Sequence, residues 1–445
     1  MVIIVDTLRA DHVYGHRART PSMDSLARDG LRFTRFFPEA MPTVPARNSI
    51  LSGSRQWPYR NWSPHRGMVQ EPGWEPFPRA DVSFTTTLRR AGYWTGYVTD
   101  NPFLSFAPGY ERLRRSFDRF VRRGGQVGGT GAGISDRELR HWLPSALDDP
   151  ETRLRMRKFL ANGQYSRREE NSFAARVFRS GAKLLNEAKR NRPFCLVLDT
   201  FEPHEPWTPP RRYIDMYGDP NYRGPEPAKP YYAPAASYMS AGERRTLLPR
   251  MRALYAAEVT MTDRWLGVFL DRLHDLRLDR DTIVVLTADH GFLLGEHGWT
   301  GKSPTQLHPE LINVPLTIVH PERRLAGRSS AYLAQSHDIG PTILAMTGVR
   351  RPRSMDGVNL ARFFRGKPLP ERKYIFGGYT NSFYVRTDNW ALSGNNGGGS
   401  LSLHNLRTDR RETRDLAARR PRKARQLRGV VRRRAGPLPR YDYPR

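Results

Sequence analysis

Short continuous runs of apolar residues, many of them β-branched, recur along the first three quarters of the chain. Such runs are typical of parallel strands that are buried on both faces of a sheet. They alternate with stretches whose apolar residues are spaced as on one face of a helix. The pattern predicts strands at residues 2–5, 31–37, 94–99, 193–200, 282–286 and 314–319, and helices at residues 21–30, 85–91, 171–189, 251–273 and 337–346.

This alternation predicts an α/β fold with a large, mostly parallel central sheet flanked by helices. After residue 350 the pattern changes to short alternating strands, which indicates a small antiparallel sheet; we expect them at residues 373–377, 382–386 and 390–392. We therefore divide the chain into an α/β domain at residues 1–350, which should carry the chemistry, a small α+β subdomain at residues 351–418, and a basic tail at residues 419–445.

Two long segments show neither the apolar runs of strands nor the apolar spacing of helices. Residues 54–78 mix aromatic residues with Pro, Gly and Arg, and predict a long loop of the kind that often forms a lid or a binding surface. Residues 120–170 are rich in Gly and Arg and are interpreted as an insertion. Specificity for a substrate is expected to lie in these two segments.

The net charge of +29 and the pI near 10.8 raise the question of a nucleic-acid partner. Arginine is spread through every segment instead of forming one stripe, with the clearest concentration in residues 419–434, which we interpret as a solvated tail. The charge should attract small anions of any kind. We do not expect nucleic acid to be the partner.

No apolar run approaches the roughly 18 residues that a membrane span requires. Met1 leads directly into an apolar strand, without the basic segment or cleavage site of a signal peptide. Cys195 is the only cysteine, which excludes an intramolecular disulfide and indicates a reducing compartment. We therefore expect no membrane span and a cytoplasmic location, although a strand at residue 1 leaves open that further residues precede it.

Acidic residues follow two of the predicted strands. Asp6 comes directly after the strand at residues 2–5, and Asp289 with His290 follows the strand at residues 282–286. Open α/β sheets bind ligands at the carboxyl ends of their strands, and carboxylate and imidazole groups are donors for a divalent metal. The sequence thus predicts a shared metal site, with turn capping by Asp6 and Asp289 as the alternative.

Residues 41–53 place a hydroxyl, a helix terminus and a cation close together. Thr43 or Val44 should cap a helix whose first turn contains Pro45. The N-terminus of a helix attracts anions, and the guanidinium of Arg47 suits phosphate or sulfate oxygens. Thr43 is therefore a candidate nucleophile; the alternative is a capped helix with a solvent-facing arginine.

A histidine and a lysine complete the candidates. Pro203 and Pro206 should hold the backbone around His204 extended, so that its imidazole can donate a proton or a hydrogen bond to an anion. An ordinary loop histidine is the alternative. Lys302 adds a cation close in sequence to the predicted metal ligands.

Together these motifs resemble the sulfatase family of the alkaline-phosphatase superfamily, over nearly the whole chain. The resemblance rests on residues 5–12, 45–53, 202–206, 287–302, 338–344 and 405–417. It implies an N-terminal metal-binding aspartate, a nucleophile near residue 43, a substrate-binding histidine and a second metal motif. It also implies a hydrolase that acts on ester bonds of small anionic substrates.

Several positions depart from the family pattern. Thr43 stands where sulfatases have the Cys or Ser that is oxidised to formylglycine, and a secondary alcohol cannot form that aldehyde. Thr7 replaces a second metal-binding aspartate, and residues 99–101 replace a Lys and His pair. His290 replaces an asparagine, which moves the expected metal from a calcium-like ion toward manganese or zinc, with calcium and magnesium as alternatives.

The combination of Thr43 with an Asp-His pair is similar to the single-metal sites of lipoteichoic acid synthases and phosphoethanolamine transferases. The Asp-His pair also resembles phosphonate monoester hydrolases, which carry formylglycine. The resemblance implies one divalent ion on Asp6, Asp289, His290 and Thr43, with Thr43 as nucleophile, Arg47 and Lys302 stabilising charge, and His204 binding the anion or protonating the leaving group.

We therefore expect phosphate or phosphonate esters in preference to sulfate esters. Transfer to another alcohol, instead of hydrolysis, stays open. One alternative is a true sulfatase that uses unmodified Thr43. Another is a catalytically degenerate member that binds anions or nucleic acid, although the presence of the metal-binding residues, Arg47 and Lys302 argues against it.

Overall fold

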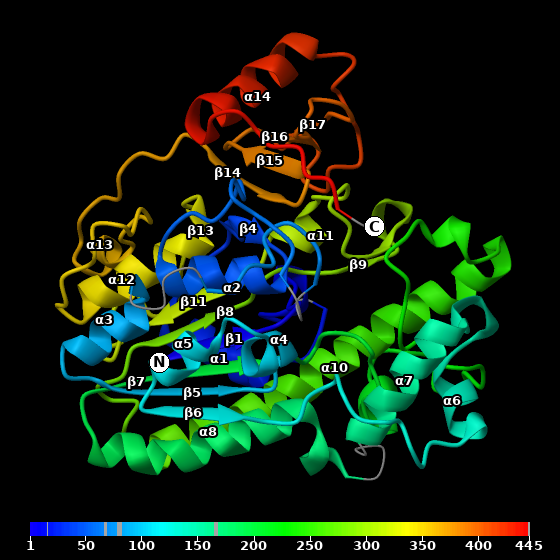
Figure 1. Cartoon of the computed structure of the whole chain (residues 1–445), viewed down its shortest axis with the longest axis horizontal. Coiled ribbons are helices and arrows are strands. Elements are labelled where there is room, and N and C mark those ends of the chain that lie inside the picture. The colour runs from blue at the N-terminus through cyan, green and yellow to red at the C-terminus, as the bar shows by residue number, and fades with distance from the viewer. Residues whose placement is uncertain (16, 66–68, 78–81, 164–167, 444–445) are drawn as a thin grey trace.

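The computed structural model describes residues 1–15, 17–65, 69–77, 82–163 and 168–443 (Figure 1). Parts of the segments at residues 54–78 and 120–170 lie outside these ranges. The centre is an eight-stranded sheet with the order β12-β2-β11-β8-β1-β7-β5-β6. Its strands are β1 (Val2–Val5), β2 (Leu31–Phe33), β5 (Trp94–Thr99), β6 (Arg119–Arg122), β7 (Phe194–Thr200), β8 (Val284–Thr287), β11 (Leu316–Val319) and β12 (Arg328–Ser330).

The sheet is mostly parallel, as the apolar runs predict. β1 pairs in parallel with both β7 and β8, and β5 pairs in parallel with both β7 and β6. β11 is antiparallel to its two neighbours. β1 is buried along its whole length at the centre of the sheet, which explains its continuous run of Val and Ile.

Helices cover both faces of this sheet (Figure 1). On one face, α8 (Phe173–Arg190) and α1 (Pro21–Asp29) pack against the long helix α10 (Ala241–Asp275). On the other face, α2 (Thr43–Ser52), α3 (Phe84–Arg90) and α12 (Ile339–Met346) pack together. The predicted fold class, an α/β sheet flanked by helices, is confirmed.

Helix α10 begins ten residues before the predicted start at residue 251. Ser240 and Glu243 form a capping box at its N-terminus, and Pro249 lies inside the helix. The first turns are mostly polar and exposed, so they carry no apolar period that sequence analysis could detect.

A second sheet of five strands lies beyond α2 and has the order β17-β16-β15-β14-β4. Its strands are β4 (Ala40–Met41), β14 (Ile375–Tyr379), β15 (Ser382–Arg386), β16 (Trp390–Asn395) and β17 (Ser402–Asn405). The predicted C-terminal antiparallel sheet is therefore present, but it also takes up β4, which pairs in parallel with β14. β4 directly precedes α2, so the C-terminal sheet is joined to the start of that helix.

The predicted solvated tail is wrong for most of its length. Residues Pro421–Ala435 form helix α14, whose side chains Leu427 and Val431 are buried against the C-terminal sheet. Apolar residues recur every three or four positions in this helix, but the surrounding arginines conceal that period in the composition. The other face of α14 carries the basic residues.

The remaining elements connect these layers. They are strands β3 (Phe36–Phe37), β9 (Leu293–Leu294), β10 (Thr300–Gly301) and β13 (Ala334–Gln335), and helices α4 (Pro102–Phe106), α5 (Glu111–Arg115), α6 (Asp136–Trp142), α7 (Pro150–Gly163), α9 (Arg211–Ile214), α11 (Pro309–Ile312) and α13 (Ala361–Phe364). The predicted strand at residues 31–37 is divided into β2 and β3. Over residues 54–65 and 69–77 the chain has neither helix nor strand, as predicted. Among the helices of the described residues, none has the length and apolar character to cross a membrane.

Candidate active site

The structure brings together Asp6, Asp289 and His290. β1 and β8 are parallel neighbours in register from Val2 with Val285, so the residues that follow them emerge at the same edge of the sheet. One ligand atom from each of the three side chains lies within 4.8 Å of the others, and all three side chains are buried. The pairing of these strands accounts for the juxtaposition that the sequence analysis expected.

The donor set fits a divalent metal ion. Among the described residues, the Asp6 carboxylate accepts no hydrogen bond, and burial together with Asp289 raises its pKa well above the usual range. His290 Nδ1 donates to the carbonyl oxygen of Gly291 at 2.9 Å, and burial lowers the pKa of this imidazole to about 4. The ring is therefore neutral, with the lone pair on Nε2, which is the form that binds metals.

Thr43 is the first residue of α2, and not its cap as expected. The N-cap is Pro42, and no side chain caps the helix. The Thr43 side chain thus makes no capping hydrogen bond, and its Oγ1 lies 3.4 Å from His290 Nε2. Thr43 is 1% exposed. The hydroxyl is therefore held beside the candidate metal ligands, at the positive end of a ten-residue helix.

Arg47 lies inside the protein among three carboxylates and does not face solvent. Its Nη1 donates to Asp289 at 2.5 Å and to the Thr43 carbonyl oxygen at 3.1 Å. Nε and Nη2 donate to Asp199, and Nη2 also lies 3.0 Å from Asp6. All three nitrogens of the guanidinium thus donate to acceptors within the protein. In this arrangement Arg47 balances the charge of the acids and is directed at them, not at solvent.

Asp199 is a member of this cluster that sequence analysis missed. It lies near the end of β7, between β1 and β5, and is fully buried. Besides Arg47, it accepts a hydrogen bond from the Tyr97 hydroxyl at 2.8 Å. The sequence carries one signal that could have identified it: an acidic residue stands within an otherwise apolar strand. A buried carboxylate requires a partner, so such a residue points to a charged or hydrogen-bonding neighbour.

His204 and Lys302 form a direct pair at the site. Lys302 Nζ lies 2.7 Å from His204 Nε2, and His204 Nδ1 lies 2.7 Å from the Glu205 carbonyl oxygen. Burial lowers the pKa of His204 to about 3, so the ring is neutral and Lys302 is the donor. The loop turns here, with His204 N donating to the Phe201 carbonyl oxygen, whereas an extended backbone was expected. The positive charge of Lys302 also acts on Asp6, whose pKa it lowers against the larger effect of burial.

The positions that depart from the family pattern serve local structure. Thr7 N donates to Asp289 Oδ1 at 3.0 Å, so Thr7 orients a candidate ligand through its backbone. Asp100 accepts a hydrogen bond from Phe201 N at 2.8 Å, beside the His204 loop. Asn101 caps α4. These contacts give the three residues roles in positioning the site.

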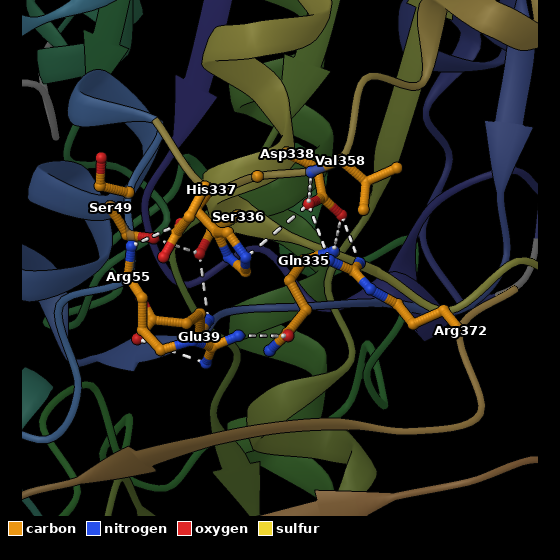
Figure 2. Close-up of polar contacts among 12 residues, drawn as sticks. Glu39, Ser49, Arg55, Gln335, Ser336, His337, Asp338, Val358 and Arg372 are labelled. Atoms are coloured by element: carbon orange, nitrogen blue, oxygen red, sulfur yellow. Dashed lines mark hydrogen bonds and ion pairs between the residues drawn. The ribbon is translucent and has the colours of Figure 1, made fainter. Parts of the chain in front are cut away.

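A buried polar network fixes α2 from the side of the C-terminal half (Figure 2). The hydroxyl groups of Ser49 and Ser336 lie 2.8 Å apart, and Ser336 Oγ also accepts from Glu39 N. Figure 2 shows Asp338 next to this contact, ion-paired with Arg372 at 2.6 Å. Residues 336–346 thus border the helix that carries Thr43, through the contact of Ser336 with Ser49 and the packing of α12 against α2.

Comparison with known proteins agrees with this geometry. Residues 1–349 match the Sulfatase family model. The chain is 27% identical over 416 residues to the multifunctional alkaline phosphatase superfamily protein PehA of Trinickia caryophylli, covering 83% of this chain and 77% of that protein. It is 25% identical over 417 residues to an arylsulfatase of Clostridium perfringens, covering 87% and 83%.

Among solved structures, the phosphonate monoester hydrolase SpPMH from Silicibacter pomeroyi has the same fold. The two superpose with a TM-score of 0.70 at 21% sequence identity, covering 98% of this chain and 94% of the other. Members of this superfamily are metal-dependent, and the cluster at Asp6, Asp289 and His290 supplies candidate ligands. The chain therefore belongs to the sulfatase family of the alkaline-phosphatase superfamily, and it is a hydrolase that acts on ester bonds.

Proposed function

We propose that this protein hydrolyses phosphate or phosphonate esters with one divalent metal ion and with Thr43 as an unmodified nucleophile. The observation that carries the proposal is the position of the Thr43 hydroxyl, 3.4 Å from His290 Nε2 and beside two buried carboxylates. A threonine cannot give the aldehyde of formylglycine, so the alcohol itself must attack. The Asp-His pair supports phosphorus chemistry.

Asp6, Asp289, His290 and Thr43 would hold the ion, and the imidazole favours manganese or zinc. When bound, such an ion supplies Lewis-acid activation of the hydroxyl and of the ester oxygens. Arg47 holds Asp289 by a hydrogen bond and lies 3.0 Å from Asp6, and its charge favours the ionised form of both carboxyls. It is therefore a positioning residue in this proposal.

In the first step, the Thr43 hydroxyl loses its proton to solvent, and Oγ1 forms a bond to phosphorus as the bond from phosphorus to the leaving oxygen breaks. Lys302, whose charge acts on Asp6 and His290, stabilises charge on the ester in this proposal, and its ammonium gives a proton to the departing alkoxide. His204 holds Lys302 by accepting its hydrogen bond. Water then hydrolyses the threonine ester: its oxygen bonds to phosphorus as the bond from phosphorus to Thr43 Oγ1 breaks, one of its protons restores the Thr43 hydroxyl, and Lys302 regains a proton from solvent.

A paired assay tests the substrate class. The wild-type protein is incubated with an aryl phosphodiester, an aryl phosphonate monoester and an aryl sulfate, each with added Mn²⁺ or Zn²⁺. We expect the highest kcat/KM on a phosphorus ester. Greater turnover of the aryl sulfate would instead support a sulfatase with unmodified Thr43, in line with the sulfate-ester activity named for the arylsulfatase relative.

Thr43→Ala tests the nucleophile, with Thr246→Ala as the matched control because Thr246 is exposed on α10. Thr43→Ala should lose turnover, and acid-quenched wild-type protein should carry a phosphoryl or phosphonyl group on the peptide that contains Thr43. Full activity in Thr43→Ala would overturn the mechanism. A wild-type protein that binds no metal and turns over none of the esters would support the degenerate, anion-binding alternative.

A further inference from the structure

We infer that the protein has a second metal site, for a zinc-class ion, formed by His308, His404 and Glu412. His308 directly precedes α11, His404 lies on β17, and Glu412 lies in the loop that follows β17. One ligand atom from each side chain lies within 4.8 Å of the others. The site thus joins the α/β part of the chain to the C-terminal sheet, and it shares no residue with the proposed active site.

The donor atoms at this junction are buried and incompletely paired. The side chains of His404 and Glu412 are 4% and 3% exposed, and that of His308 is 13% exposed. His308 Nδ1 has no hydrogen-bond partner among the described residues and lies 3.7 Å from Glu412 Oε2. A buried nitrogen without a partner costs free energy, which a bound cation would offset.

His404 is held in the orientation that metal-binding histidines usually have. Its Nδ1 donates to the Arg414 carbonyl oxygen at 3.0 Å, which leaves the lone pair on Nε2. Ser402 Oγ lies 2.8 Å from Nε2, and its hydroxyl can rotate away when a cation takes that lone pair.

Glu412 presents one oxygen to the cluster and anchors the other. Arg386 Nη2 pairs with Oε1 at 2.5 Å, while Oε2 faces His308. Ligating carboxylates are commonly held in place by a second polar or charged group in this way. The backbone of Glu412 has a φ of +55°, a conformation that L-residues rarely adopt and that tends to persist at functional positions.

Two imidazoles and one carboxylate are a donor set that suits Zn²⁺, with water in the fourth position. The His297 ring stacks on His308 with a centroid distance of 3.6 Å and covers one side of the site. α11 is also bonded to the segment after His290, since Gly291 N donates to Leu311 O at 2.7 Å. The ion would therefore fix the C-terminal sheet to the segment that carries the active-site ligands.

Metal stoichiometry of the full chain tests this inference. Protein freed of metal by chelation is given excess Zn²⁺, dialysed, and measured by elemental analysis. We expect about two ions per chain in the wild type, and about one in each of His404→Gln and Glu412→Gln. The control His274→Gln, at a histidine whose side chain is 77% exposed, should keep two. His290→Ala should lose the other ion and keep this one.

A spectroscopic readout covers variants that fold poorly. Co²⁺ bound to His290→Ala should give the visible absorption of a four-coordinate ion, and adding Glu412→Gln should remove that absorption. Zn²⁺ should also raise the Tm of His290→Ala, and Glu412→Gln should abolish the rise. The inference would be overturned if the wild-type chain held a single ion that His290→Ala removes, or if Glu412→Gln kept two ions. Neither result depends on the substrate class proposed above.

Discussion

Replacing Arg47 with methionine should destabilise the folded protein severely, because it removes the shared counter-ion of three buried carboxylates. Arg47, Asp6, Asp199 and Asp289 are all 0% exposed, so water does not screen the loss. Breaking a buried ion pair by removing one partner costs about 3–5 kcal/mol. Alternatively, one carboxyl takes up a proton in the native state; at pH 7, with a carboxyl pKa near 4 in the unfolded chain, this costs about 4 kcal/mol. An unpaired buried charge and a protonated carboxyl therefore give about the same loss of stability.

The loss should depend on pH and on metal. Without Arg47, one cation fewer opposes the burial that raises the pKa values of Asp6 and Asp289, so we expect the native state to bind protons that the unfolded state does not. The free energy of unfolding of Arg47→Met should therefore recover as pH falls from 7 toward 4, by about 1.4 kcal/mol per pH unit for each proton taken up. A divalent ion gives Asp6 and Asp289 a new partner but leaves Asp199 without one, so metal should restore only part of the stability.

Urea unfolding followed by tryptophan fluorescence measures these effects, at pH 7 and pH 5, with a chelator and then with excess Mn²⁺ or Zn²⁺. Arg47→Met combined with Asp199→Asn should be more stable than Arg47→Met alone, because the double variant no longer contains the unpaired charge of Asp199. An Arg47→Met protein within about 1 kcal/mol of the wild type at both pH values would refute the reasoning. A normal stability with a raised KM would instead indicate that Arg47 binds the substrate directly.

Three further changes test other parts of the structure. Thr43→Ser keeps a hydroxyl at the start of α2 and should hold kcat within about tenfold of the wild type, whereas Thr43→Ala should lower kcat by at least about a thousandfold in initial-rate assays. Burial lowers the pKa of His337 to about 3, below its value of 6.5 in the unfolded chain, so protonation of the unfolded state should cost stability as pH falls below 6.5. Between pH 6.5 and pH 4, urea unfolding of His337→Gln should therefore show a pH slope smaller than that of the wild type by about 1.4 kcal/mol per unit, and an equal slope would contradict this. Leu427→Ala should lose about 2–5 kcal/mol in the same assay if α14 packs as described, while the exposed Arg425→Ala should change little.

The sequence by itself determined the class of fold and the first residues of the site. Continuous apolar runs identify strands that are buried on both faces, and such strands require helices on both sides. Because parallel strands present their carboxyl ends at one edge, Asp6 and Asp289 could be placed together from local pattern alone. The predicted roles of Thr43, Lys302 and His204 as groups that act on a substrate stay predictions.

Only the tertiary structure decided how charges pair across elements that are distant in the sequence. The position of Asp199 beside Arg47 depends on the register of β7 against its neighbours and on the packing of α2 over the sheet. The entry of β4 into the C-terminal sheet depends in the same way on contacts over more than 300 residues, and the packing of α14 depends on the face that this sheet presents. The periodicity of apolar residues shows that one face of a helix or strand is buried, but not which other element packs against that face. Arg47 could therefore be recognised from the sequence as a cation near the nucleophile, while its three carboxylate partners are set by the fold.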